Sequence, residues 1–137
     1  ALHACSSVCP LPSVAAVSYA LLIANILIAN GFPDAPSDAQ VGKRTLAVRL
    51  GPRAGAWGYV ALAVLAHLWI AAMVWALVLP LPTLWALASA PLALAAGALL
   101  LRYGHQPARL RPALVLGIAA AVVHGLGLAL GFWLVGR

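Results

Sequence analysis

Four long apolar segments without a single charged side chain constrain this chain more than any other feature. They cover about residues 12–30, 55–79, 84–101 and 112–136. An uncharged apolar run of about 20 residues matches a helix that crosses the hydrocarbon core of a bilayer. Runs this long lack the alternation of barrel strands, and only helices or closed barrels satisfy their backbone in lipid. We therefore expect an all-α polytopic bundle of four transmembrane spans.

The scarcity of charge supports a lipid-facing exterior. Only 7% of the residues are charged, whereas a soluble domain carries about 25% because its surface faces water. The apolar excess excludes a disordered chain, and two cysteines are too few for a disulfide framework. The spacing of Cys5 and Cys9 is poor for a structural zinc site, so we expect no metal there.

The basic residues indicate the orientation in the membrane. All of them except Arg137 lie in two short segments, 43–53 and 102–111, each beside an apolar run. Basic loops beside spans are typical of cytoplasmic loops, and this reading excludes nucleic acid as the partner of the +6 net charge. We expect a multi-pass protein of the cell (inner) membrane, with loops 31–54 and 102–111 cytoplasmic and a tight turn at 80–82 on the outer face.

Several residues on the spans have predicted structural roles. A GxxxG pair, Gly127 and Gly131, predicts close helix packing. Trp69 lies mid-span and is expected inside the bundle. His67 and His124 also lie mid-span, and we expect hydrogen bonds between helices from both. The aromatic residues expected at the membrane surfaces are Trp57, Tyr59, Trp75, Trp85, Tyr103 and Trp133.

Asp34 and Asp38 are the two acidic residues of the chain, and they stand four apart at the end of the first span, with Asn30 four residues earlier. On a helical path such positions share one face, so the three side chains would present oxygens in a row. Two adjacent carboxylates repel unless a cation neutralises them, and Mg²⁺ prefers such oxygen ligands, often together with substrate phosphates. Lys43 and Arg44 follow and suit phosphate oxygens. These residues, beside a lipid-facing bundle, indicate a substrate with a diphosphate head and an apolar tail.

Two other interpretations remain open at this point. Asp34 could be a helix N-cap, and the basic residues could serve membrane topology alone. The chain could also be a non-enzymatic four-helix membrane protein, such as a transporter subunit or assembly factor, whose acidic pair binds an ion. An ion pathway should place polar groups at membrane depth in several spans, and here such groups are sparse.

The segment 30–51 resembles the second aspartate-rich motif of the UbiA-type prenyltransferases, and it is closest to the menaquinone-pathway branch, the 1,4-dihydroxy-2-naphthoate polyprenyltransferases. That branch reads approximately N-x-F-P-D-x-x-x-D-x-x-x-G-K-R-T-L-x-V-R-L-G. The matching residues are Asn30, Phe32, Pro33, Asp34, Asp38, Gly42, Lys43, Arg44, Thr45, Leu46, Val48, Arg49, Leu50 and Gly51. Ala35 and Pro36 depart from the family, which commonly has an aromatic or aliphatic residue and then a glutamate there.

The resemblance implies a nine-helix fold of which this chain, residues 1–137, would be the last four helices. It implies Mg²⁺-dependent transfer of a prenyl group from a prenyl diphosphate to an aromatic acceptor, in menaquinone or related quinone biosynthesis. Asp34 and Asp38 would be the catalytic Mg²⁺ ligands, assisted by Asn30. Lys43 and Arg44, together with Asn30, would contact the diphosphate.

The same resemblance leads us to expect a longer protein. The chain starts at Ala1 and its one methionine is Met73. The first aspartate-rich motif would lie in a missing N-terminal half, and the isolated fragment is expected to be inactive. Dihydroxynaphthoate is the acceptor that the branch suggests, while 4-hydroxybenzoate or a chlorin stays open. Arg49, Arg109 and Arg111 are expected to act in topology rather than in catalysis.

Overall fold

The structure is a computed structural model that describes residues 10–137, and within this range it is entirely helical. The elements are α1 (Pro10–Gln40), α2 (Leu46–Trp75), the 3₁₀ helix η1 (Leu81–Ser89), α3 (Ala90–Tyr103), a short 3₁₀ turn η2 (Pro107–Arg109) and α4 (Arg111–Val135). Four helical segments, the third of them η1 with α3, are long and apolar enough to cross a membrane. The expected all-α bundle of four spans is confirmed. Cys5 and Cys9 lie outside the described residues.

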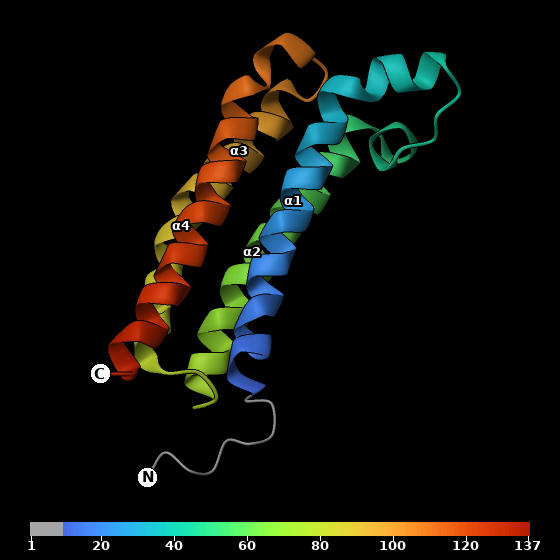
Figure 1. The fold of residues 1–137 in the computed structure, drawn as a ribbon. Coiled ribbons are helices and arrows are strands. Elements are labelled where there is room, and N and C mark those ends of the chain that lie inside the picture. The colour runs from blue at the N-terminus through green and yellow to red at the C-terminus, as the bar shows by residue number, and fades with distance from the viewer. Residues whose placement is uncertain (1–9) are drawn as a thin grey trace.

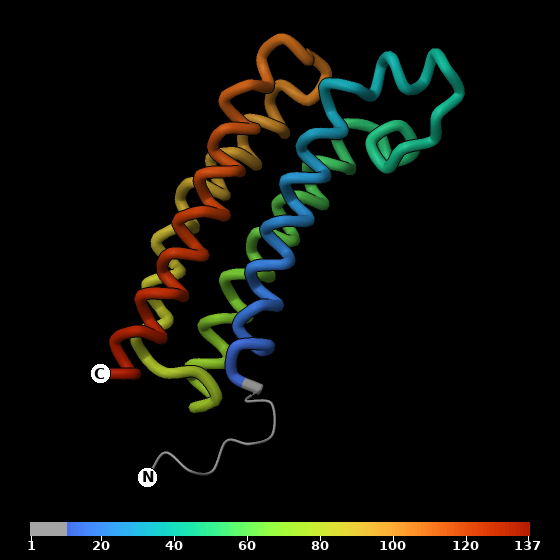
Figure 2. The backbone as a smooth tube through the Cα atoms, viewed as in Figure 1, coloured from blue at the N-terminus to red at the C-terminus, as the bar shows by residue number. Residues whose placement is uncertain are grey.

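The four spans run alongside one another as one elongated bundle (Figure 1). The start of α1, the α2–η1 turn and the end of α4 lie at one end, and the α1–α2 and α3–α4 connections lie at the other (Figure 2). We call the latter the motif end, because it carries residues 30–51. The two basic segments therefore share one end, as their charge pattern predicted.

Alanine forms most of the core, because small side chains let the helices approach closely. Ala56, Ala63, Ala93, Ala96 and Ala113 are each at most 1% exposed. The GxxxG prediction is confirmed: a Cβ added at Gly127 would lie 2.6 Å from Ala86 Cα, and one at Gly131 would lie 2.6 Å from Thr83 Cα. These two glycines therefore allow α4 to lie directly against η1.

A polar cluster crosses the middle of this core. Ser18 of α1, His67 of α2, Ser89 of η1 and His124 of α4 form it, and we call it the histidine–serine cluster. Ser18 Oγ lies 2.9 Å from His124 Nε2, and Ser89 Oγ lies 2.8 Å from His67 Nε2 and 3.2 Å from His124 Nδ1. The two rings meet edge to face at 5.5 Å. The expected interhelical hydrogen bonds of both histidines are confirmed.

The aromatic residues divide between surface and interior. Trp57, Trp75, Trp85 and Trp133 are each more than half exposed, as residues facing the headgroup layer should be. Tyr59 is 1% exposed, so its assignment to that layer was wrong. Its ring contributes apolar surface to the core, beside the close approach of Gly97 and Gly117. Trp69 is half-buried and donates its indole N–H to the Val14 carbonyl at 2.8 Å, which confirms its place inside the bundle.

Some helices begin or end at other residues than the predicted spans. The third span begins as 3₁₀ helix at Leu81, and α-helix follows from Ala90. Pro91 lacks the N–H that would continue an α-helical ladder from η1, which accounts for the break. The chain reverses at residues 76–79 rather than at 80–82. The fourth span agrees with the prediction to one residue at each end.

Candidate functional site

The segment expected as loop 31–54 is mostly helical, and this places the acidic pair on a helix. α1 continues through Pro33 and Pro36 as far as Gln40, and α2 begins at Leu46. Each proline removes one backbone hydrogen bond, and the end of α1 bends away from the bundle axis (Figure 1). At about 1.5 Å per residue, α1 before its prolines is long enough to cross the ~30 Å hydrocarbon core. The bent end therefore lies where the bilayer meets water.

Asp34 and Asp38 lie one turn apart on this bent end. Residues four apart on a helix have Cβ atoms about 5–6 Å apart on one face. Asn30, one turn earlier, and Asp34 are exposed, whereas the Asp38 side chain is only 13% exposed. The interpretation of Asp34 as an N-cap is wrong, because the helix continues on both sides of it. The helical path expected for Asn30, Asp34 and Asp38 is present, because all three lie within α1.

A glycine turn ends α1 and returns the chain to Asp38. Gly42 has a φ of +73°, a conformation that costs glycine little. The Lys43 N–H donates to the Asp38 carbonyl at 2.8 Å, and the Gly42 N–H donates to the Ala39 carbonyl at 3.2 Å. These two bonds form a Schellman motif, the commonest way in which glycine terminates a helix. Gly42 thus ends the helix, and the backbone of Lys43 completes the turn.

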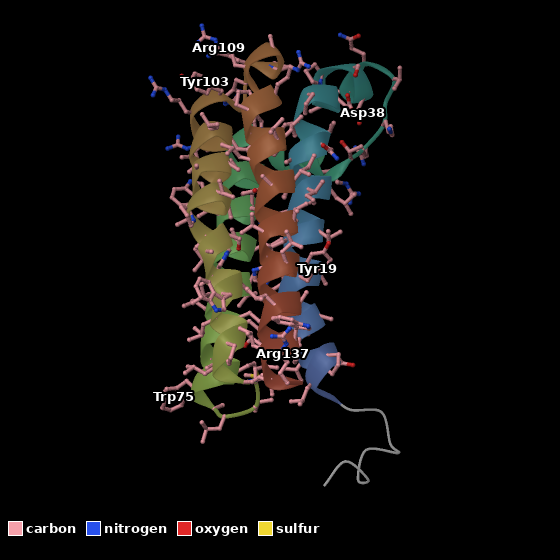
Figure 3. The ribbon with its side chains drawn as sticks, turned by 60° about the vertical axis from the view of Figure 1, so that its left-hand side comes forward. Tyr19, Asp38, Trp75, Tyr103, Arg109 and Arg137 are labelled. Carbon is pink, nitrogen blue, oxygen red and sulfur yellow. The ribbon has the colours of Figure 1, made fainter. Side chains whose placement is uncertain are left out.

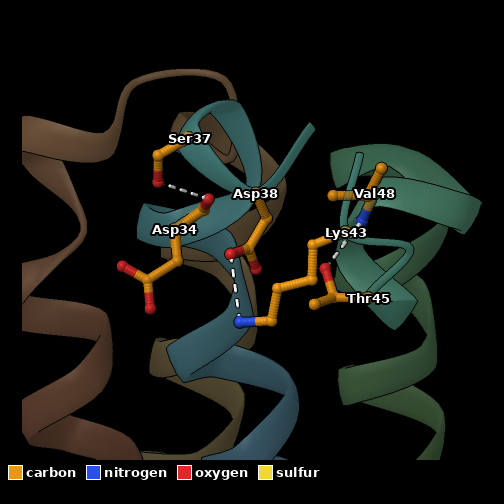
Figure 4. A network of polar contacts seen from close by, with 6 residues as sticks. All are labelled: Asp34, Ser37, Asp38, Lys43, Thr45 and Val48. Carbon is orange, nitrogen blue, oxygen red and sulfur yellow. Dashed lines mark hydrogen bonds and ion pairs between the residues drawn. The ribbon is translucent and has the colours of Figure 1, made fainter. Parts of the chain in front are cut away.

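The same turn brings the Lys43 side chain onto Asp38. Lys43 Nζ donates to Asp38 Oδ1 at 3.1 Å, and Figure 4 shows the lysine reaching back across the turn to the carboxylate. This is the one ion pair among residues 10–137. Asp34 has no such partner in that range; its neighbour Ser37 donates only to the Asp34 backbone carbonyl, at 2.9 Å. One carboxylate of the pair is thus compensated, and the other is open.

A second glycine shapes the approach to α2. Thr45 caps α2 by accepting a hydrogen bond from the Val48 N–H at 3.4 Å (Figure 4). Gly51 then adopts φ 74° and ψ 164°, and Pro52 restarts the helix after this break. The short turn Leu46–Leu50 is therefore set apart from the long part of α2. Arg44 lies in the connection before it and is exposed.

These residues suit a hard cation and a phosphate. Mg²⁺ takes oxygen ligands and commonly uses one or two carboxylates, with waters and phosphate oxygens filling the remaining positions. Asp34 and Asp38 supply such oxygens from one helical face, and the open carboxylate of Asp34 is free to bind. Within residues 10–137 no third carboxylate, histidine or cysteine joins them. The donor set fits a partial magnesium site that leaves room for phosphate.

The clefts at the motif end do not contain this pair. One cleft of about 270 Å³ is lined by Phe32, Ala35, Pro36 and residues of α2 and the α3–α4 connection. Another of about 240 Å³ lies between α1 and the start of α2. Asp34 lies on the exposed face of α1, outside both. Any substrate cavity that includes the acidic pair must be closed by something on that face.

Comparison with known families supports the interpretation of the motif. A model of the UbiA prenyltransferase family matches residues 1–118. The chain belongs to the UbiA prenyltransferase family. Searches of curated proteins and of solved structures returned no match. UbiA membership agrees with the helical bundle and makes the chain a multi-pass membrane protein of a family of prenyltransferases.

The polar residues of the bundle form two groups that lie at different depths. Asn30, Asp34, Asp38, Lys43 and Arg44 gather at the motif end, as the sequence predicted. The histidine–serine cluster lies at the middle of the bundle and bonds only within it. The sequence pattern identified the first group but not the role of Gly42, whose signal was its place immediately before Lys43.

Proposed function

We propose that this chain serves in a membrane-embedded transfer of a prenyl group from a prenyl diphosphate to an aromatic acceptor. The observation that carries the proposal is the open carboxylate of Asp34 beside the Asp38–Lys43 pair, at one end of a lipid-facing bundle. Within the family, the motif resemblance favours the menaquinone-pathway branch, and thus dihydroxynaphthoate as the acceptor. The basic residues of the motif end, together with the same resemblance, favour a cytoplasmic position for it.

The acidic and basic residues at the motif end would bind different parts of the substrate complex. Asp34 and Asp38 would hold Mg²⁺, with Asn30 assisting, and Lys43 and Arg44 would donate hydrogen bonds to diphosphate oxygens. Bound there, Mg²⁺ would stabilise negative charge on the departing diphosphate. Lys43 also neutralises Asp38 when no diphosphate is present, so it keeps the two carboxylates compatible on one helix face.

The chemistry to be assisted is the ionisation of an allylic C–O bond. Its electron pair leaves with the diphosphate, and the allylic carbon then takes an electron pair from the aromatic ring, which loses a proton. Lys43 and Arg44 would stabilise the charge on the leaving oxygen. Apolar side chains of the bundle would keep water from the allylic cation.

We further propose that residues outside this chain complete the site. Asn30 and Asp34 on α1 are exposed, and within residues 10–137 no third carboxylate, histidine or cysteine joins Asp34 and Asp38. A nine-helix protein would cover this face with its N-terminal half and supply the first aspartate-rich motif. The isolated 137 residues are then expected to transfer no prenyl group, and transfer by them alone would contradict this part of the proposal.

The test is a transfer assay on the protein with its upstream coding sequence, in membranes, with a labelled prenyl diphosphate and dihydroxynaphthoate. We expect Mg²⁺-dependent product that is lost in the double variant Asp34→Ala, Asp38→Ala. Ser37→Ala is the matched control, because Ser37 lies between the two aspartates and bonds only to a backbone carbonyl. Transfer that survives in the double variant would remove both aspartates from the mechanism.

A further inference from the structure

A second cleft at the motif end lies between α2 and α3, away from the acidic pair. It has a volume of about 390 Å³, and its walls include Arg53 and Trp57 of α2, Leu101 of α3, and His105 just after α3. We call it the α2–α3 cleft. Asp34 and Asp38 are on α1 and do not line it.

Both walls of this cleft have the same order of polarity. Arg53 precedes Trp57 by one helical turn on α2, which runs away from the motif end. Leu101 precedes His105 by four residues at the end of α3, which runs toward it. On each wall, therefore, the basic or polar residue lies at the end of the bundle, and the apolar residue lies one turn deeper. A phospholipid has the same order, with its phosphate above its acyl chains.

The depth of the cleft agrees with the position of a lipid headgroup. Trp57 is 57% exposed on the outside of the bundle, and tryptophan prefers the layer between headgroups and hydrocarbon. Arg53 and His105 are exposed as well. A side chain one turn above Trp57 is at the level where phosphates lie.

The positive charge around the cleft lacks an anionic partner within the chain. The two aspartates are its whole complement of acids, and Asp38 already pairs with Lys43. Beside the cleft, the guanidinium groups of Arg102 and Arg109 lie 5.2 and 5.5 Å from the centre of the Tyr103 ring. Figure 3 shows Tyr103 and Arg109 at the motif end. Both guanidinium groups contact one ring, so positive charge gathers at this end of the bundle, and a bound anion would offset it.

We propose that the α2–α3 cleft binds an anionic phospholipid. The Arg53 guanidinium and a His105 ring N–H donate to the phosphate oxygens, and an acyl chain lies along Trp57 and Leu101. Basic pockets between transmembrane helices bind anionic headgroups in this way. Anionic lipids should bind more tightly than zwitterionic ones, because the cationic group of a zwitterionic headgroup would lie next to Arg53 and repel it.

The test is lipid binding to the detergent-solubilised chain, measured by native mass spectrometry with added phosphatidylglycerol or phosphatidylcholine. We expect phosphatidylglycerol to be retained preferentially. Arg53→Gln should weaken its binding about fivefold, the effect of about one basic residue near a membrane surface. Arg49→Gln is the matched control, since Arg49 is an exposed arginine near the start of α2 that does not line the cleft. It should change the affinity less than about twofold.

A second variant tests the apolar half of the site. Trp57→Ala removes a side chain that faces outward, so the bundle should still fold, and we expect it to weaken phosphatidylglycerol binding. Equal losses in Arg53→Gln and Arg49→Gln would show diffuse attraction rather than a site. Equal binding of phosphatidylcholine, or competition by glycerol phosphate at lipid-like concentrations, would also overturn the proposal.

Discussion

At the scale of single residues, the backbone contacts of the histidine–serine cluster favour the same tautomer in both rings when they are neutral. A carbonyl oxygen only accepts hydrogen bonds, and each histidine Nδ1 faces one: His67 the Ala63 carbonyl at 2.6 Å, and His124 the Ala86 carbonyl at 3.2 Å. Both Nδ1 atoms must therefore carry the proton. Both Nε2 atoms then accept, from Ser89 in His67 and from Ser18 in His124. Each serine hydroxyl shares its one proton between that ring nitrogen and a backbone carbonyl at 2.8 Å, the Ala86 carbonyl for Ser89 and the Ala15 carbonyl for Ser18.

The resulting chain of hydrogen bonds has a fixed direction. Ser18 donates to His124, His124 to Ser89, Ser89 to His67, and His67 to the Ala63 carbonyl. It keeps this direction as long as both Nδ1 atoms carry the proton, because the opposite direction would leave His67 Nδ1 without a proton beside the Ala63 carbonyl. The cluster therefore joins α1, α2, η1 and α4 through hydrogen bonds inside the bundle.

This assignment predicts the tautomer of both histidines. In ¹⁵N-labelled protein reconstituted in bilayers, His67 and His124 should both show a protonated Nδ1 and a bare Nε2. His124→Leu identifies the signals of one ring, and each interhelical hydrogen bond that it removes should cost about 0.6 kcal/mol on average and at most about 1.7 kcal/mol. The exposed His105 is the internal control and should not share this tautomer preference. A protonated Nε2 with a bare Nδ1 in either buried ring would contradict the network.

At the scale of elements, the contact between α4 and η1 depends on two glycines. Gly127 and Gly131 bring the α4 backbone against the backbone of η1, so an added methyl group would meet backbone atoms that cannot rotate away. Gly127→Ala and Gly131→Ala should each lower the free energy of unfolding by about 1–3 kcal/mol, the usual cost of overpacking.

Gly58→Ala provides the control for this prediction. Gly58 also lies inside a helix, but an added Cβ would meet nothing within 4 Å, so alanine there should be neutral or stabilising by up to about 1 kcal/mol. Thermal unfolding in detergent compares the three variants. Equal midpoints for all three would mean that α4 and η1 do not pack as closely as described.

Helices that are marked by long apolar runs could be predicted from the sequence. Local backbone geometry that depends on a single proline or glycine could not. The uncharged runs predicted all four spans, and the spacing of Asp34 and Asp38 agrees with their place on one helix. Pro33 and Pro36 suggested a loop, yet α1 continues through both, as membrane helices tolerate where other groups satisfy the freed carbonyls. The pairing of Lys43 with Asp38 needs the positive φ of Gly42, which a sequence pattern only hints at.

At the scale of the whole molecule, charge is distributed unequally between the two ends. Both aspartates and every basic residue except Arg137 are at the motif end, while Arg137 stacks on Trp133 at the other, 3.7 Å from its ring centre (Figure 3). Membrane proteins keep such basic ends in the cytoplasm.

Cysteine labelling tests this orientation. In a background with Cys5→Ser and Cys9→Ser, a membrane-impermeant maleimide added to intact cells, or to spheroplasts where an outer membrane is present, should label Ala76→Cys in the α2–η1 turn. It should not label Val41→Cys or Gln106→Cys at the motif end until the membrane is opened. All three positions are exposed, so access alone does not decide the result. Labelling of the motif end in intact cells would place the acidic pair on the outer face.

The central claim is that Asp34 and Asp38 bind Mg²⁺ together with a prenyl diphosphate, and affinity tests it more directly than turnover. The measurement is the Kd for a prenyl diphosphate with and without Mg²⁺, on the protein with its upstream sequence, for the unchanged chain, Asp38→Asn and Ser37→Ala. We predict that Mg²⁺ tightens binding, that Asp38→Asn weakens it at least about tenfold in Mg²⁺, and that Ser37→Ala leaves it unchanged. Binding that is equally tight with and without Mg²⁺, or unchanged in Asp38→Asn, would contradict the claim.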